Sequence, residues 1–252
     1  MRTVAVMLLT LGTVSASAQY YYYMNVVQKN GEKFQYLVSK IDSVYFSAVN
    51  YEYVDLGLSV KWATCNVGAT RPEEFGDYFS WGETEPKDDY SWSAYKWCNG
   101  SINTLTKYCD NSNYGNEGFT DMLTVLNPED DVAHVKWGGS WRMPTEAEME
   151  DLSTKCTWRW YVEGNSEFGG VAGHKITSNI AGYEDRFIFL PAAGYRYNSN
   201  ISSVGYYGYY WCNSLRTDRQ GHARSLYYYS HYRNPNYCDE RNSGLTVRPV
   251  CP

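Results

Sequence analysis

The chain has 252 residues, of which 43% are hydrophobic, 17% aromatic and 20% charged, and its formal net charge is −6. This composition excludes a disordered or fibrous chain, because enough apolar area is present to bury a core. The negative charge argues against nucleic acid or an anionic membrane surface as a partner.

Residues 1–18 have the pattern of a secretory signal peptide. Arg2 gives a positive start and residues 4–14 are apolar. Ala16-Ser17-Ala18 is typical of a cleavage site before Gln19. No later stretch approaches the ~20 apolar residues of a spanning helix. We therefore expect an exported protein without a transmembrane segment, located in the periplasm, at the cell surface or outside the cell.

Residues 19–48 are expected to form a short N-terminal β-strand extension. Tyr23–Val27 and Phe34–Val38 flank the turn signal Asn30-Gly31 and together indicate a hairpin. Ile41–Phe46 is expected to be a third strand. Strands of this kind can add to the sheet edge of another protein, so a surface assembly partner is one expectation.

Residues 51–252 are expected to form one β-rich α+β domain of short strands, long loops and one or two helices. Strands are expected at Arg186–Pro191, Ala223–Ser230 and Leu245–Val250. The Gly-, Asn-, Ser- and Tyr-rich segments 198–210 and 231–243 are expected to be loops. Bulky residues must fill the interior of such a domain, and the expected core tryptophans are Trp62, Trp81, Trp141, Trp158 and Trp160.

One helix is expected after residue 144. Thr145 and Glu148 have the spacing of a capping box. Met149, Leu152 and Cys156 fall at i, i+3 and i+7, so they form one apolar stripe that can pack on a sheet. The acidic residues around them are interpreted as a solvated helix face.

Alternation along the strand 223–230 assigns its side chains to two faces. Leu226 and Tyr228 are expected to turn inward, and Ser225, Tyr227 and Tyr229 are expected to turn outward. A shift of one residue in register would reverse this assignment.

The C-terminal region is unusually rich in tyrosine. Residues 195–237 contain eleven of the 26 tyrosines, and residues 176–252 contain eight arginines but no lysine or methionine. Tyrosine offers a large amphipathic surface at a low entropic cost, and the interleaved Ser, Asn, Gly and Arg supply adaptable hydrogen bonds. This composition is typical of a binding surface.

Seven cysteines in an exported chain favour disulfides, and the odd number leaves one cysteine unpaired or intermolecular. The candidate pairs are Cys98 with Cys109, Cys65 with Cys156, and Cys212 with Cys238. Free thiols are the alternative.

No catalytic residue and no cofactor is assigned from the sequence. The four histidines lack ligand spacing, and no C-x-x-C pair, phosphate-binding loop or nucleophile elbow is present. Glu129, Asp130 and Asp131 provide oxygen atoms suited to a structural calcium ion. A solvated acidic run is the alternative for these three residues.

Several motifs in the same order resemble a known family. Val54–Gly68, Gly76–Glu83, Gly138–Pro144 and Phe189–Arg196 are similar to the Fibrobacter succinogenes major paralogous domain of exported Bacteroidetes proteins. The resemblance covers residues 51–250. It implies a C-type-lectin-like fold with a mixed sheet, few helices and termini that meet.

Two further stretches, Arg142–Leu152 and Leu245–Val250, resemble the formylglycine-generating enzymes. That family uses a paired-cysteine copper site, and Cys212, Cys238 and Cys251 do not map onto its motif. An oxidoreductase of this type is therefore an alternative function. The sequence triplets of calcium-dependent sugar binding are missing.

The tyrosine-rich region also resembles the variable region of lectin-fold proteins diversified by retroelements. Randomising both adenines of an AAC codon cannot produce Lys, Met, Glu, Gln or Trp. Between residues 198 and 242 these types occur only as Trp211, Gln220 and Glu240, which would then be fixed positions. Ordinary inheritance of a tyrosine-rich β-protein is the alternative.

The sequence therefore predicts an exported binding or adhesion module whose ligand is an unknown protein or glycan. The expected ligand-binding residues are Tyr206, Tyr207, Tyr209, Tyr210, Asn213, Arg216, Ser225, Tyr227, Tyr229, His231, Arg233, Asn236 and Tyr237. The alternatives are the oxidoreductase and a structural subunit of a surface or pilus assembly.

Overall fold

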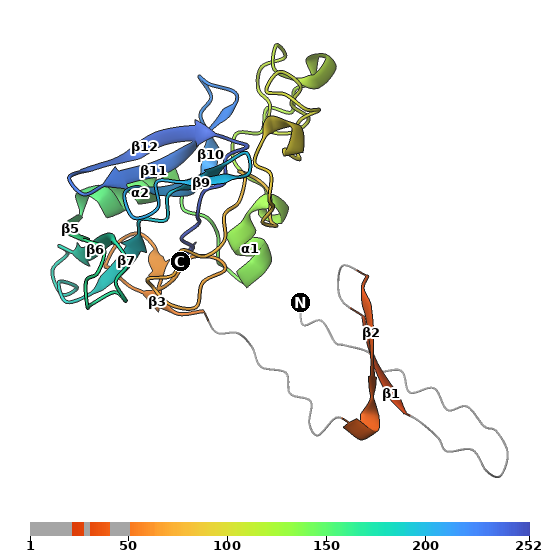
Figure 1. Ribbon diagram of the computed structural model, residues 1–252. Helices are drawn as coiled ribbons and strands as arrows, with labels where there is room; N and C mark the ends of the chain where they lie inside the picture. The colour runs from red at the N-terminus through yellow and green to blue at the C-terminus, as the bar shows by residue number, and fades with distance from the viewer. Residues whose placement is uncertain (1–21, 28–30, 41–50) are drawn as a thin grey trace, which may run out of the picture. The chain divides into compact units, whose positions relative to one another are not determined.

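The computed structural model describes residues 22–27, 31–40 and 51–252 of the chain. The chain divides into two compact units, Met1–Asn50 and Tyr51–Pro252 (Figure 1). The expected signal peptide and the expected strand 41–46 lie outside the described residues. Within the described part, no helix is long and apolar enough to cross a bilayer.

The described part of the first unit is the expected hairpin. Strands β1 (Tyr23–Val27) and β2 (Lys33–Leu37) pair antiparallel and are followed by a single 3-10 turn, Val38–Lys40. Most of its side chains, including apolar ones, are exposed.

The second unit is a β-rich α+β domain built on small antiparallel sheets. Strands β3 (Tyr53–Val54), β4 (Lys61–Ala63) and β13 (Val250–Cys251) form one sheet in the order β13-β4-β3. Because β13 pairs with β4, the end of the domain returns to its beginning.

A second sheet has the order β5-β6-β7. Its strands are β5 (Cys156–Tyr161), β6 (Gly173–Ser178) and β7 (Phe187–Pro191). Strand β7 confirms the strand expected at residues 186–191. A two-stranded ribbon of β8 (Tyr195–Tyr197) and β9 (Asn200–Ser202) follows it.

The third sheet carries most of the tyrosine-rich region and has the order β10-β11-β12. Its strands are β10 (Gly208–Leu215), β11 (His222–Tyr229) and β12 (Tyr232–Glu240). Strand β11 confirms the strand expected at residues 223–230. The expectation of loops at 198–210 and 231–243 is wrong for much of both segments. Strand β12 accommodates Pro235 because it is an edge strand beside a register shift.

The segment 245–250 is the other correction to the expected strands. Leu245 bridges Phe79, and Thr246 bridges Tyr210, so only single residues pair on each side. Regular pairing begins at Val250. Leu245 and Val247 belong to one buried core cluster and Val250 to another, so the segment is buried although it forms no continuous strand.

The helices are short. Helix α1 (Val132–Trp137) follows the 3-10 turn Pro128–Asp130, and two further 3-10 turns lie at Trp92–Ala94 and Asn116–Gly118. Helix α2 (Glu146–Thr154) lies against the β10-β11-β12 sheet (Figure 1).

Helix α2 begins as the sequence predicts. The Thr145 hydroxyl accepts a hydrogen bond from the Glu148 backbone N–H, and the Glu148 carboxylate accepts one from the Thr145 backbone N–H. Met149 and Leu152 are fully buried. Cys156 is buried as well but is the first residue of β5, because the helix ends at Thr154.

The tryptophans divide between the core and its margin. Trp62 and Trp81 are fully buried, as expected. Trp158 and Trp160 are half-buried and pack against the core cluster around Trp62. Trp141 is half-buried and contacts the Trp137 ring edge-on.

All seven cysteines are free, so the three expected disulfides are absent. Cys212 lies on β10 and Cys238 on β12, with β11 between them. Two strand spacings of about 4.8 Å exceed the ~7 Å that a disulfide spans between Cα atoms. The thiols of Cys98 and Cys109 instead donate hydrogen bonds to carbonyl oxygens of their own segments.

Two buried arginines hold distant segments together. The Arg248 guanidinium donates to the Asn66 side chain and to the carbonyl oxygens of Ala63, Thr64 and Phe189 at 2.8–3.0 Å. Neither Arg248 nor Arg241 pairs with a carboxylate among the described residues.

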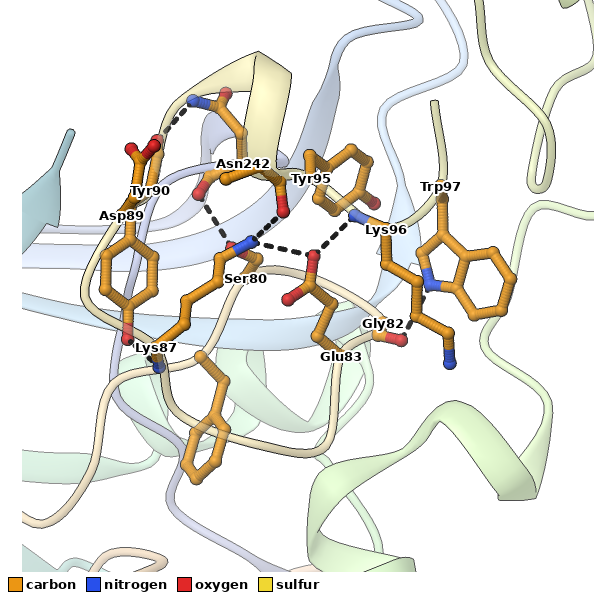
Figure 2. Close-up of polar contacts among 12 residues, drawn as sticks. Ser80, Gly82, Glu83, Lys87, Asp89, Tyr90, Tyr95, Lys96, Trp97 and Asn242 are labelled. Carbon is orange, nitrogen blue, oxygen red and sulfur yellow. Dashed lines mark hydrogen bonds and ion pairs between the residues drawn. The ribbon is translucent and has the colours of Figure 1, made fainter. Parts of the chain in front are cut away.

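A buried polar network fastens the C-terminal segment to residues 80–97 (Figure 2). The Ser80 hydroxyl donates to the Asn242 carbonyl, and the Asn242 amide donates to the Tyr90 carbonyl, both at 2.7 Å. Beside them the Glu83 carboxylate accepts from the Lys87 ammonium and the Lys96 backbone N–H. This network attaches residues 80–96 to the segment that follows β12.

Replacing Arg248 with alanine is expected to lower the free energy of unfolding by about 3–5 kcal/mol, because four buried acceptors lose their donor and a cavity remains. Arg224→Ala is the control, since Arg224 makes an outer ion pair with Glu146 that contributes about 0–1 kcal/mol. Urea unfolding of both variants measures the difference. Equal losses would contradict a structural role specific to Arg248.

Candidate functional site: a tyrosine face and an adjoining cavity

One face of the β10-β11-β12 sheet is covered by mutually contacting tyrosine rings. We call this surface the tyrosine face, and its members are Tyr195, Tyr207, Tyr209, Tyr227, Tyr229, Tyr232 and Tyr237. They come from β8, from β10 and the residue before it, from β11 and from β12.

The rings form a continuous array across the sheet. The Tyr227 ring centroid lies 4.9 Å from that of Tyr209 and 4.9 Å from that of Tyr237. Tyr229 lies 6.0 Å from Tyr227 and 5.4 Å from Tyr232. These separations lie in the 4.5–7 Å range of favourable aromatic pairs, so each ring limits the motion of its neighbours.

Strand alternation explains why these rings face outward. Leu226 and Tyr228 are fully buried on the other face, as the sequence predicts. The Tyr228 hydroxyl donates to the Leu190 and Pro191 carbonyl oxygens at 2.8 and 2.9 Å. Opposite it in β10 stands Gly208, where any Cβ would collide with the Tyr228 ring.

Two expected ligand-binding residues are buried, and their assignment is wrong. Tyr210 is fully buried and donates its hydroxyl hydrogen to the Pro191 carbonyl. It follows Tyr209 in β10 and therefore faces the core. Ser225 lies beneath the rings and donates to the Asp239 carboxylate at 2.6 Å, so it supports the surface from below.

Two more expected residues contact the helix instead of the tyrosine face. Arg233 donates to the Ser153 carbonyl at the end of α2, and the Asn236 amide donates to the Glu150 carboxylate. Arg233 pairs with the buried Tyr228 across the sheet, which places it on that face. Both are exposed at the edge, but they lie on the α2 side.

The remaining residues that were expected to bind a ligand lie at separate places around the sheet. Tyr206 has 73% of its surface exposed, and His231 is exposed in the turn between β11 and β12. Asn213 is half-buried, and its backbone N–H donates to the Pro144 carbonyl. Arg216 forms an ion pair with Asp218 beyond the end of β10.

A cavity of about 360 Å³ adjoins the tyrosine face. Its lining residues are Tyr195, Tyr209, Arg219, His222, Tyr237, Cys238, Asp239, Glu240 and Ser243. Three of these residues belong to the tyrosine face, so the cavity and the face form one continuous surface.

Asp239 is the unusual group of this cavity. Burial raises the pKa of its carboxyl to about 6, and the hydrogen bond from Ser225 only partly offsets this effect. Burial also lowers the pKa of His222 to about 4, so His222 is neutral at pH 7. Burial raises the pKa of Tyr227 to about 12, which keeps this ring neutral as well.

The three acidic residues whose oxygen atoms suit a structural calcium ion have protein partners in the structure. Asp131 accepts three backbone N–H groups around the start of α1, and Asp130 binds the Lys107 ammonium and the Tyr108 hydroxyl. Glu129 also lies near Lys107. Among the described residues no group of three or more His, Cys, Asp or Glu side chains is arranged to hold a metal ion.

The cysteines do not fit a paired-thiol copper site. Cys212, Cys238 and Cys251 lie on β10, β12 and β13, and no two of them are bonded. Burial raises the pKa of Cys212 well above its usual range, so it is a neutral core thiol.

Comparison of the chain with protein-family models, characterised proteins and solved structures gave no match.

Sequence reasoning missed Tyr195, Tyr232, Arg219 and Asp239. Tyr195 reaches the face from a different ribbon, which strand alternation alone cannot reveal. Tyr232 and Asp239 were missed because β12 was interpreted as a loop. Period-two alternation through Tyr237 and Asp239 was the available signal.

Tyr228→Ala and Tyr229→Ala test the two faces of β11. The first is expected to cost about 3–5 kcal/mol of unfolding free energy, because a fully buried ring and two hydrogen bonds are lost. The second is expected to cost about 1 kcal/mol, since its ring contacts only surface neighbours. Chemical denaturation measures both, and a reversed order would show that the register is wrong.

Asp239→Asn is expected to stabilise the protein at pH 7.5 by on the order of 1 kcal/mol. The folded-state pKa of about 6 lies above the usual value of 3.8, so the parent loses stability as the pH rises between these values. Asparagine cannot ionise and avoids this loss. Unfolding curves at pH 4 and 7.5 should therefore diverge only at the higher pH. A constant difference at both pH values would contradict the assignment.

Proposed function

We propose that this chain is an exported ligand-binding module that presents the tyrosine face to a protein or glycan partner. The observation that supports this most directly is the array of seven contacting rings on one face of a sheet whose other face is firmly packed. Rigid rings lose little entropy on binding, and large ring areas contribute strongly to affinity.

The fold that suits this function is a C-type-lectin-like domain of the Fibrobacter succinogenes major paralogous type. A β-rich α+β domain with two short α-helices among the described residues and with its end paired to its beginning supports the proposal. In such a domain the tyrosine-rich region would form the ligand-binding side.

Retroelement diversification of this region is part of the proposal. Trp211 and Gln220, which adenine-directed variation could not create, are both buried. The Trp211 indole donates to the Phe79 carbonyl, and Gln220 contacts Asp110. The third fixed position, Glu240, is half-buried and lines the cavity, so two of the three fixed residues are buried. Sequencing the gene's neighbourhood tests this, and it fails without a reverse transcriptase and a template repeat.

The binding function is tested by replacing Tyr207, Tyr227, Tyr229 and Tyr232 together with alanine. Binding to ligands found on an array of glycans and surface proteins is expected to be abolished. The Tm is expected to fall by no more than about 16 °C, because each of the four rings contributes about 1 kcal/mol or less to stability. Tyr53→Ala is the control, since Tyr53 is 52% exposed on β3. Retained binding by the fourfold variant would refute the proposal.

A second candidate function, assembly through the N-terminal hairpin, is favoured by a separate observation. Tyr23, Val27, Phe34 and Tyr36 are 40–62% exposed on a two-stranded hairpin, which is marginally stable by itself. Pairing with a strand of another protein would cover such residues.

Removal of residues 20–48 tests assembly through the hairpin. If the hairpin pairs with other chains, the mature protein should form a larger species in light scattering, and the shortened chain should be monomeric. A mature chain that is monomeric with and without this segment would count against self-assembly.

A further inference from the structure

The cavity beside the tyrosine face is lined by tyrosine residues together with two carboxylates that have no cationic partner among the described residues. Tyr195, Tyr209 and Tyr237 line it, and the Tyr209 ring centroid lies 5.2 Å from that of Tyr195 and 6.4 Å from that of Tyr237. Asp239 and Glu240 line the same cavity from the edge strand β12. Its volume of about 360 Å³ is near the lower end for small-ligand sites and suits one side chain.

Neither carboxylate has a cationic partner among the described residues. The Asp239 carboxylate accepts one hydrogen bond, from the Ser225 hydroxyl to Oδ2, and no described donor contacts its Oδ1. Neither Asp239 nor Glu240 takes part in a described ion pair, whereas Asp218 pairs with Arg216 nearby. A partly buried, unpaired carboxylate is costly, and a cation from outside would offset that cost.

The basic residues that line the cavity do not neutralise Asp239 and Glu240. Arg219 lines the cavity, but it forms no described ion pair with either carboxylate. His222 is neutral at pH 7 because burial lowers its pKa to about 4. Two acidic groups thus face one unpaired guanidinium, and the cavity carries a net negative charge when Asp239 is ionised.

We propose that this cavity binds the ammonium or guanidinium group of a lysine or arginine side chain on a protein partner, an inference that rests on the binding function proposed above. The rings attract the cation through their faces, and Asp239 and Glu240 accept its hydrogen bonds. The surrounding tyrosine face contacts the rest of the partner.

The position of Asp239 favours a side chain over an amino sugar. Its carboxylate is partly buried, and the rings of Tyr209 and Tyr237 line the same cavity. A flexible apolar stem can carry a terminal cation past these rings. An amino sugar bears its ammonium directly on a bulky ring, which would have to enter whole.

The test titrates the full chain with small probes followed by NMR at pH 7.5. The cationic probes are Nα-acetyl-lysine amide and Nα-acetyl-arginine amide, and their neutral counterparts are the norleucine and citrulline amides. The cationic probes are expected to shift the ring signals of Tyr209 and Tyr237 and to bind at least about tenfold more tightly than their counterparts. Equal binding of cationic and neutral probes would overturn the inference.

Two variants should change the affinity in opposite directions. Asp239→Asn is expected to weaken binding of the lysine probe about tenfold, although it stabilises the fold. Arg219→Gln is expected to strengthen binding by about two- to threefold, because a like charge leaves the cavity. A purely structural role for these residues would not produce opposite signs. No change in the Asp239 variant would refute the site.

The outcomes separate this inference from the proposed function. Glucosamine binding more tightly than both amino-acid probes would replace the protein side chain by an amino sugar and overturn the inference. If the fourfold tyrosine variant loses its array ligand while Asp239→Asn retains it fully, the tyrosine face binds but the cavity does not. If the cationic probes bind while the fourfold variant still holds its array ligand, the proposed function fails by itself.

Discussion

Two buried guanidinium groups determine how the second unit is held together. Arg241 donates to the carbonyl oxygens of Lys107, Tyr108 and Gln220 and to the Tyr95 hydroxyl, and Arg248 binds a second set of carbonyl oxygens around β4 and β7. A buried cation is tolerated only when its N–H groups find acceptors, so these segments must keep one arrangement. Both arginines belong to the final twelve residues, which therefore connect the separate small sheets.

This arrangement gives the tyrosine face a rigid base. The Trp211 backbone N–H donates to the Thr246 carbonyl, so β10 is attached to the segment that Arg248 fixes. On the other side, Arg233 connects β12 to helix α2 through its hydrogen bonds to the Ser153 carbonyl. The sheet is therefore attached at both of its edge strands, β10 and β12. Its exposed rings lose little further conformational entropy when a partner binds, which favours affinity.

Local patterns in the sequence predicted the elements whose own residues determine them. The capping box of Thr145 and Glu148, the β1–β2 hairpin and the two faces of β11 all follow from spacing along a single segment. The binding residues were predicted less well, because exposure depends on what packs over a strand. Tyr210 and Ser225 are of residue types that are common in binding surfaces, yet both are fully buried. Tyr210 faces the core, and the Ser225 hydroxyl donates to the Asp239 carboxylate.

The composition of strand β12 led to its prediction as a loop. Most of the other errors in the predicted binding residues follow from that prediction. Its Asn, Pro and Tyr residues are typical of a loop, and only pairing with β11 makes the segment a strand. Once it is a strand, Tyr237 and Asp239 share one face, and Arg233 and Asn236 contact α2. Likewise, the expected Cys212–Cys238 bridge fails because β11 lies between its two ends.

Asp239 contrasts with the arginines that stabilise this fold. Arg241 and Arg248 satisfy their N–H groups with protein acceptors, whereas Asp239 has one hydroxyl donor and aromatic neighbours that do not solvate its charge. An amide at this position would make the fold more stable at neutral pH, because it cannot ionise. Local destabilisation of this kind is characteristic of functional positions. Here it lies where a tyrosine array meets an open cavity, and a cation from a partner would supply the charge that the fold does not.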